Sequence, residues 1–243
     1  MKLVARLAHY LTGRERLASR LRKVLPEKFW ILGDDALTAL EQWAGGQAGV
    51  RFIQIGSNDG ATNDPLHRLV VERHWEGVLV EPLPPLFEQL QRTYRDRPGL
   101  SFVNAAVGAD NGEATFFYVD GSRPGDPYWV PQIGSLERSH LTRHASVIPD
   151  LEQRIAEARV PVLTYAGLLA DAGIDQYDLL HVDAEGVDYL ILEQVDFASS
   201  AGPRAVLFEH RHMAAADEAE LRRRLDAAGF TSNPGRMDTF AYR

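Results

Sequence analysis

Short apolar runs alternate with amphipathic segments from residue 50 to the end of the chain. Most of the apolar runs lack the polar alternation of a half-exposed strand, which is typical of parallel strands that are buried on both faces. The intervening segments repeat apolar residues every three or four positions, as amphipathic helices do. We therefore predict strands at residues 50–56, 77–82, 100–108, 114–120, 177–186, 204–210 and 239–243, and a short strand followed by a helix at 160–173. Helices are predicted at residues 64–74, 84–95, 188–196 and 218–229.

This alternation predicts an α/β fold, with a doubly wound and mostly parallel sheet of the Rossmann-like kind. The strand at 114–120 follows the turn sequence "ADNG" at 109–112, so we expect it to be antiparallel. Residues 121–159 are interrupted by Pro and Gly before a helical stretch. An irregular insertion of this kind commonly forms a lid or a substrate pocket.

Leucines recur at helical spacing near the start of the chain and predict one or two amphipathic helices over residues 2–25. The sequence "AGGQAG" at 44–49 then predicts a hinge, which separates an N-terminal helical segment at 1–48 from a main domain at 49–243. Residues 1–28 hold eight Lys or Arg against two Glu, a net charge of +6. Two interpretations are open: a cap that packs on the domain or on a second subunit of a homo-oligomer, and a basic face that contacts an anionic membrane or an acidic partner.

The composition excludes several classes of function. The chain of 243 residues contains no cysteine, which excludes disulfides, thiolate nucleophiles and cysteine-ligated metal sites. Its net charge of −8 argues against a nucleic-acid-binding protein, whose binding face is basic. No apolar run approaches the roughly 20 residues of a membrane-spanning helix. The run "LVARLAHYL" at 3–11 is interrupted by Arg6 and His9, unlike a signal peptide, so we expect a cytoplasmic protein.

Polar residues follow the predicted strands at their carboxyl ends. In open α/β sheets, ligands bind outside these ends, near the point where the strand order reverses. The residues at the five ends are Gly56 to Gly60, Glu81 and Pro82, Asn104 to Ala106, Asp183 to Glu185, and Glu209 with His210. A single acid in such a place is explained by helix capping. Acids or amides at all five ends predict a polar pocket at one edge of the sheet.

The first of these loops, "GSNDG" at 56–60, indicates the kind of ligand. Gly56 and Gly60 allow the backbone to approach a ligand closely, and an acid about 20 residues further on, here Glu81, suits the paired hydroxyls of a ribose. Asn58 stands where the dinucleotide fingerprint G-x-G-x-x-G has its second glycine. A pyrophosphate therefore fits poorly, which disfavours a nicotinamide-dependent oxidoreductase. A nucleoside without phosphates, such as S-adenosylmethionine, fits better.

The chain resembles the FkbM methyltransferases, within the class I fold that binds S-adenosylmethionine. The resemblance covers residues 50–212, and its most specific part is the D-x-E-G sequence at Asp183 to Gly186. It is carried by "FIQIGSNDGATNDP" (52–65), "GVLVEP" (77–82), "FVNAAVG" (102–108) and "YDLLHVDAEGVDYLIL" (177–192). The cofactor-binding residues that it implies are Gln54, Ile55, Gly56, Ser57, Asn58, Gly60, Glu81, Pro82, Asn104, Ala105, Asp183, Ala184 and Glu185.

Two residues depart from the pattern of the family. Gln54 stands where many class I methyltransferases carry an acid, so we expect only an amide or water-mediated contact to the amino group of the cofactor. His181 stands within a strand where the family often has a lysine. A buried core histidine is favoured there over a catalytic one.

The resemblance implies a methyltransferase, and O-methylation of a hydroxyl on a sugar, glycan or secondary metabolite is the leading hypothesis. A hydroxyl acceptor requires a base and alignment for in-line displacement. The candidate catalytic residues are Asp183, His210 and His212, beside Glu185. The candidate substrate contacts in the lid are Tyr128, Trp129, Ser135 and His140. The lid aromatics either stack on the acceptor or pack the lid onto the domain.

The polar strand ends and the basic N-terminal segment each leave one more hypothesis open. Asp183, Glu209 and His210 are candidate ligands for a divalent cation, and their oxygen atoms suit Mg²⁺ better than Zn²⁺. The alternative to an enzyme is a non-catalytic scaffold of the same fold that recruits partners or a membrane through the basic N-terminal helices. The intact glycine loop and Glu81 count against the scaffold, which has no need of them.

Overall fold

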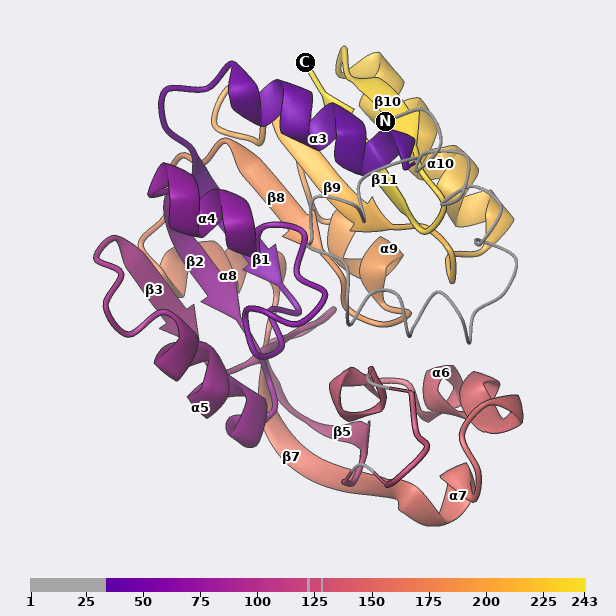
Figure 1. The fold of residues 1–243 in the computed structure, drawn as a ribbon. Helices are drawn as coiled ribbons and strands as arrows, with labels where there is room; N and C mark the ends of the chain where they lie inside the picture. The colour runs from indigo at the N-terminus through magenta and orange to yellow at the C-terminus, as the bar shows by residue number, and fades with distance from the viewer. Residues whose placement is uncertain (1–33, 122, 128) are drawn as a thin grey trace, which may run out of the picture.

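The computed structural model describes residues 34–121, 123–127 and 129–243. A seven-stranded sheet in the order β10-β11-β9-β8-β1-β2-β3 forms its centre (Figure 1). The strands are β1 (Arg51–Ile55), β2 (Glu76–Val80), β3 (Leu100–Val103), β8 (Leu179–Val182), β9 (Ala205–Glu209), β10 (Thr231–Pro234) and β11 (Asp238–Tyr242). The neighbouring strands β3, β2, β1, β8 and β9 pair in parallel, and β11 is antiparallel to both of its neighbours, β9 and β10. The predicted α/β fold with a mostly parallel sheet is confirmed.

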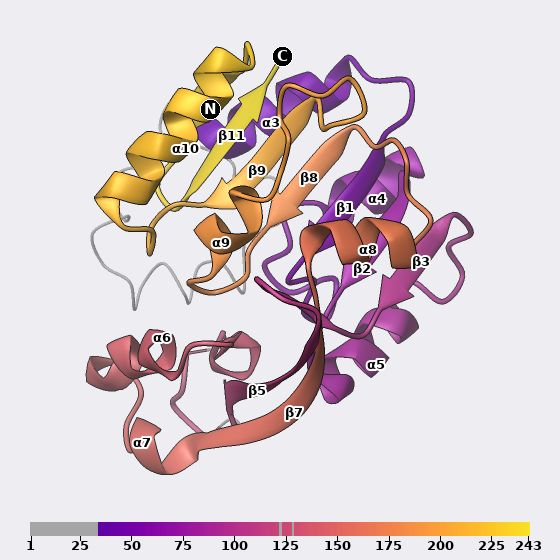
Figure 2. The ribbon, with the colours of Figure 1, turned by 180° about the vertical axis from the view of Figure 1, so that it is seen from behind.

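Helices cover both faces of this sheet. Figure 1 shows one face, which carries α3 (Asp35–Gly45), α4 (His67–Arg73) and α5 (Pro84–Thr93). Figure 2 shows the opposite face, which carries α8 (Tyr165–Asp171), α9 (Asp188–Leu192) and α10 (Ala215–Ala227). Successive strand residues point to opposite faces, so Phe52 belongs to the core under α3 to α5 and Ile53 to the core under α8 to α10. Two separate hydrophobic cores therefore sandwich the sheet.

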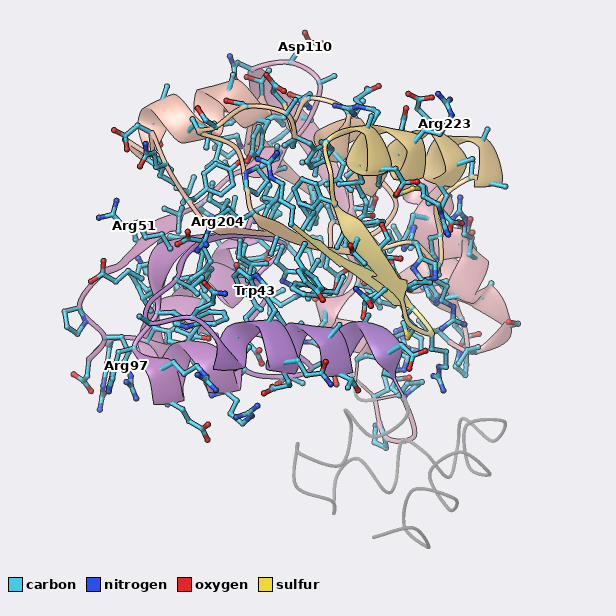
Figure 3. All side chains as sticks on the ribbon, turned by 90° about the horizontal axis from the view of Figure 1, so that it is seen from above. Trp43, Arg51, Arg97, Asp110, Arg204 and Arg223 are labelled. Carbon is cyan, nitrogen blue, oxygen red and sulfur yellow. The ribbon has the colours of Figure 1, made fainter. Side chains whose placement is uncertain are left out.

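Helix α3 was not predicted from the sequence, although it begins with a strong cap. The Asp34 carboxylate accepts hydrogen bonds from the backbone N–H groups of Ala36 and Leu37, at 3.0 and 3.3 Å. Trp43 lies on the face turned toward the sheet (Figure 3) and makes edge contacts with Trp75 and Phe240. Residues 35–45 thus share a core with the sheet, and the segment expected at 1–48 is continuous with the domain over this stretch. The helices predicted over 2–25 lie outside the described residues.

A second sheet extends from the first and carries the insertion. Its order is β4-β7-β5-β6, with β5 antiparallel to β7 as predicted. The elements of this region are β4 (Ala106–Val107), β5 (Gly112–Val119), η2 (Val130–Gln132), β6 (Gly134–Ser135), α6 (Arg138–Thr142), η3 (Arg143–Ser146), α7 (Leu151–Arg154) and β7 (Ile155–Leu163). Both ribbon views show a separate lobe, called the lid below and formed by residues 112–163, facing the carboxyl ends of the central strands (Figures 1 and 2).

The lid has its own small core and an internal ion pair. Its core side chains include Val130, Ile133 and Leu141, all almost fully buried. Arg154 binds the carboxylate of Asp126 through both terminal nitrogens, at 3.0 and 2.6 Å, and the two side chains are 1% and 6% exposed. The lid is therefore a folded unit rather than a loose loop.

Some predicted boundaries are wrong for local reasons. The expected strand at 100–108 is divided into β3 and β4, which belong to different sheets. Helix α4 begins at His67, one turn later than predicted, because Asp64 caps the backbone N–H of Leu66 in a preceding turn. Among the described residues, no helix combines the length and the apolar character that a membrane span requires.

Candidate active site

The loops after β1 and β8 cross at the point where the strand order reverses. Ile55 pairs with Val182, so Gly56 and Asp183 follow side by side. Gly56 has a φ angle of +84°, and a Cβ atom placed on it would lie 1.8 Å from the carbonyl oxygen of Asp183. Only glycine allows two backbones to approach this closely. The crossing is the position at which open α/β sheets bind ligands.

Glu81 lies at the end of β2, beside this crossing, and is 3% exposed. Its Oε2 atom accepts a hydrogen bond from the backbone N–H of Asn58 at 3.0 Å, and its Oε1 atom accepts one from Leu83 at 2.8 Å. Asn58 is held in the left-handed region, with a φ angle of +48°. Burial raises the pKa of Glu81 to about 7, although both hydrogen bonds act in the opposite direction. The carboxylate therefore fixes the shape of the first loop.

A pocket opens over these strand ends and encloses about 480 Å³, part of it open to solvent. The central domain contributes Ile55, Gly56, Asn58, Glu81, Pro82, Leu83, Leu86, Ala105, Ala106, Val107, Asp183, Ala184, Glu185 and Val187. The lid contributes Phe116, Gln132, Gly134 and Leu136. The wall is mainly apolar, with carboxyl groups at three places.

Gln54 and Ser57, both expected at the cofactor, support the loop from beneath and do not line the pocket. The Ser57 hydroxyl donates to the carbonyl of Gln54 at 3.1 Å and accepts from the N–H of Val80 at 3.2 Å. Gln54 is 1% exposed, and its Oε1 atom is buried without a hydrogen-bond partner in the described residues. The side-chain amide of Gln54 is therefore enclosed below the loop and does not face the pocket.

Asn104 and Gly60 likewise have roles outside the pocket wall. The Asn104 amide donates to the backbone carbonyls of Glu81 and Pro82, at 2.8 and 3.0 Å, and so ties the ends of β2 and β3 together. A Cβ atom on Gly60 would lie 2.6 Å from the side chain of Tyr94, so this glycine permits the packing of the loop on α5. The pocket residues on this side are instead Ala105 to Val107.

The D-x-E-G loop after β8 is held in a strained shape by an acid that sequence reasoning did not assign to the site. Glu185 and Gly186 have φ angles of +52° and +100°. Asp188 accepts hydrogen bonds from the N–H groups of Ala184 and Gly186, at 2.9 and 3.0 Å, one on each carboxylate oxygen. Burial raises the pKa of Asp188 to about 6. The sequence signal that could have identified Asp188 is its position two residues after Gly186 of the D-x-E-G loop.

Asp183 and Glu209 end the neighbouring strands β8 and β9. Burial raises the pKa of both carboxyl groups, and the negative charge of the nearby Glu185 raises each further. Asp183 lines the pocket, whereas Glu209 does not. A carboxyl group with a raised pKa is a stronger base once it is ionised. Asp183 is therefore the candidate base that is best placed in this pocket.

Three histidines meet next to the D-x-E-G loop. Nε2 of His140, a fully buried residue of α6, lies 2.7 Å from the Oε2 atom of Glu185. His140 also packs edge-on against His212, with ring centroids 4.9 Å apart, and lies 5.8 Å from the ring of His144. Burial lowers the pKa of His144, and it lowers that of His212 to about 4. His144 was not assigned to the site from the sequence.

The other predicted lid and loop residues have different environments. Trp129 packs its ring 5.3 Å from that of His144. Ser135 is fully buried, and its hydroxyl accepts the N–H of Glu137 at 3.1 Å. His210 shares a hydrogen bond of 2.9 Å with the hydroxyl of Thr239. Tyr128 lies outside the described residues.

The predicted cation site is not supported. In the described part of the chain, the ligand atoms that gather closely enough for a metal belong to His140, His144 and His212. Asp183, Glu209 and His210 do not form such a group. His210 is directed to Thr239, and Glu209 has its Oε1 atom 4.0 Å from Nε2 of His212. The negative charge of Glu209 raises the pKa of Asp183.

His181 lies on β8 within the sheet, 3% exposed. Burial lowers its pKa to about 3, so the imidazole is neutral at neutral pH. It pairs in register with Gln54 and does not line the pocket.

Comparisons with known proteins agree on the fold. The model of the FkbM methyltransferase domain matches residues 54–232. The solved FkbM methyltransferase of Methylobacillus flagellatus KT is 10% identical with a TM-score of 0.51, and the match covers 89% of this chain and 50% of that one. The chain thus spans about half the length of that protein. No curated protein sequence matches the chain.

Two more distant likenesses were found. The N-terminal domain of human METTL16 is 12% identical with a TM-score of 0.41, over 84% of this chain and 66% of that one. The precorrin-6y C5,15-methyltransferase of Geobacter metallireducens GS-15 is 8% identical with a TM-score of 0.41, over 85% and 87%. Neither likeness is close enough to bear on the acceptor.

Proposed function

The chain belongs to the FkbM methyltransferase family, and from that premise we propose that it is an O-methyltransferase that uses S-adenosylmethionine. The proposed acceptor is a hydroxyl of a sugar, glycan or secondary metabolite. The observation that carries the proposal is the pocket at the switch point, where Gly56 and Glu81 lie together at the ends of adjacent strands.

The pocket residues fit the cofactor that the family implies. A Cβ atom on Gly56 would overlap the carbonyl oxygen of Asp183, so glycine lets the ends of β1 and β8 meet closely at the pocket. Glu81 presents a buried carboxyl group suited to the hydroxyls of a ribose, and Ala105 to Val107 offer a small apolar surface suited to an adenine. When bound, S-adenosylmethionine supplies an electrophilic methyl group on a sulfonium, whose loss leaves a neutral thioether and needs no acid. The protein must then align the acceptor and remove its proton.

We assign proton removal to Asp183. Asp183 lines the pocket, and its pKa is raised by burial and by the neighbouring Glu185. The rate constant of the methyl-transfer step should therefore rise with pH and reach a plateau once Asp183 is ionised. Asp183→Asn should abolish this rise while leaving cofactor affinity within a few-fold. A pH profile that stays the same in Asp183→Asn would contradict the assignment.

Calorimetry with S-adenosylhomocysteine, the demethylated cofactor, tests the proposed function. We expect one molecule to bind per chain, and Glu81→Gln to weaken binding about 10-fold or more, because it removes a charged hydrogen-bond acceptor. Glu76→Gln is the matched control, since Glu76 lies on the same strand at its opposite, exposed end. Absence of binding at high micromolar concentration would favour the scaffold alternative. Transfer of a labelled methyl group to a panel of hydroxyl acceptors then identifies the substrate class.

A further inference from the structure

Three histidine side chains from separate parts of the chain converge where the lid meets the central domain. His140 lies on α6, His144 on η3 and His212 in the segment between β9 and α10. Each offers one ring nitrogen, and these three atoms lie within 4.8 Å of one another. His140 and His144 are four residues apart on consecutive helical turns, a spacing that turns both side chains to the same side. The cluster is thus built by two elements of the lid and one loop of the domain.

Two nitrogen atoms of this cluster lack a partner. Nδ1 of His140 and Nε2 of His144 are buried and accept or donate no hydrogen bond within the described residues. Buried polar atoms are almost always paired in native proteins, so a ligand or ordered water is needed at this place.

Carboxylates flank the cluster on two sides. Glu185 lies 2.7 Å from Nε2 of His140, and Glu209 lies 4.0 Å from Nε2 of His212. Metal-binding histidines commonly have a carboxylate on the second ring nitrogen, which fixes the tautomer and the ring orientation. Trp129 packs against His144 and contributes an apolar neighbour. The residues around the three histidines, as well as the histidines themselves, therefore resemble those of a metal centre.

We propose that His140, His144 and His212 bind one divalent transition-metal ion, of the zinc class, which fastens the lid to the central domain. Three imidazoles with carboxylates nearby suit Zn²⁺ and its neighbours, whereas Mg²⁺ prefers oxygen ligands. The ion holds α6 and η3 against the loop that follows β9, and through His140 it orients Glu185 at the pocket wall. The site is independent of the identity of the methyl acceptor.

Titration of the protein with Co²⁺ tests the site, because bound Co²⁺ has visible absorption bands that report nitrogen ligands and geometry. The full chain without an affinity tag is first treated with a chelator. We expect one equivalent of Co²⁺ to saturate the bands and Zn²⁺ to displace it. His144→Ala and His212→Ala should each weaken Co²⁺ binding by more than about 10-fold, since even outer-shell changes have effects of that size. His74→Asn, which removes an imidazole at the end of α4, should bind like the wild type.

Hydrogen exchange of the wild type alone tests the role of the ion without any variant. We expect Zn²⁺ to slow amide exchange in both 138–146 and 210–213, the two segments that the ion joins. Protection of neither segment, no saturable Co²⁺ band, or a Co²⁺ affinity equal to that of the wild type in both alanine variants would overturn the site and leave an ordered water as the partner of the buried nitrogens. Binding of S-adenosylhomocysteine is measured on the same samples. If the nucleoside binds and Co²⁺ does not, the metal site is wrong while the proposed function stands.

Discussion

Replacing Gly56 by alanine tests whether the crossing of the β1 and β8 loops builds the pocket. The new Cβ atom would lie 1.8 Å from the carbonyl oxygen of Asp183 and 2.8 Å from its carbonyl carbon. Both are backbone atoms, so no side-chain rotation relieves the overlap. One loop must move by more than an ångström, and the hydrogen bond of 3.0 Å between the Asp183 N–H and the Ile55 carbonyl lies directly at the crossing.

Gly229→Ala is a control that isolates the overlap. Gly229 has a φ angle of +83°, against +84° for Gly56, but a Cβ atom on it would meet nothing within 4 Å. Both variants therefore carry the same left-handed strain, about 1–2 kcal/mol, and the same gain from a stiffer unfolded chain, about 0.4–1 kcal/mol. The difference between them is the cost of the overlap, about 1–3 kcal/mol for overpacking of this kind.

Thermal unfolding and calorimetry measure the two consequences. At about 2–4 °C per kcal/mol for a chain of this size, the melting temperature of Gly56→Ala should lie roughly 2–12 °C below that of Gly229→Ala. Gly56→Ala should also lose S-adenosylhomocysteine affinity by about 10-fold or more, whereas Gly229→Ala should keep it. If Gly56→Ala melts no lower than Gly229→Ala and binds the nucleoside equally well, the crossing does not shape the site.

Three further substitutions test other parts of the structure. The pKa of Glu81 in the folded protein, about 7, lies above its usual value of 4.5, so the stability that the protonated Glu81 contributes is lost as the pH rises. The melting temperature of the wild type, measured relative to that of Glu81→Gln, should therefore decrease as the pH is raised from about 5 to about 8. Asp188→Asn leaves one acceptor oxygen where two N–H groups each bind a separate oxygen, and it should weaken nucleoside binding. Asp196→Asn is the control, because both N–H groups that Asp196 binds share a single oxygen, which an asparagine keeps. Arg154→Met should destabilise the protein in denaturant titrations by about 1–3 kcal/mol, against about 0–1 for the exposed Arg159→Met, and equal effects would refute a structural ion pair.

Much of the fold follows from local patterns, and the errors have local causes. The parallel strands were predicted because their residues are buried on both faces and therefore apolar throughout. Helix α3 was missed although Ala36, Leu40 and Trp43 repeat at helical spacing, because the glycines after it were interpreted only as a hinge. The long strand β7 was shortened because residues 155–159 were assigned to the helical stretch at the end of the insertion, although Ala156 to Arg159 alternate apolar and polar residues as a half-exposed strand does.

The site shows the limit of sequence reasoning more clearly. Glu81 and Asp183 both line the pocket, as expected for residues at strand ends of a parallel sheet, which share one edge. Gln54 and Asn104 were assigned to the cofactor from their positions. The Gln54 side chain is instead buried, and the Asn104 amide donates to the backbone carbonyls of Glu81 and Pro82. The histidine cluster joins segments about 70 residues apart in the chain, and only its His140–His144 spacing is a local signal.

Hydrogen exchange in the presence of saturating S-adenosylhomocysteine tests the proposed cofactor site most directly, because it shows where the nucleoside binds as well as whether it does. We expect slower amide exchange in peptides that contain 55–60, 81–86 and 183–187, the segments that meet at the crossing, and unchanged exchange in α10. Unchanged exchange in all three segments, or protection confined to other parts of the chain, would show that the pocket is not the cofactor site.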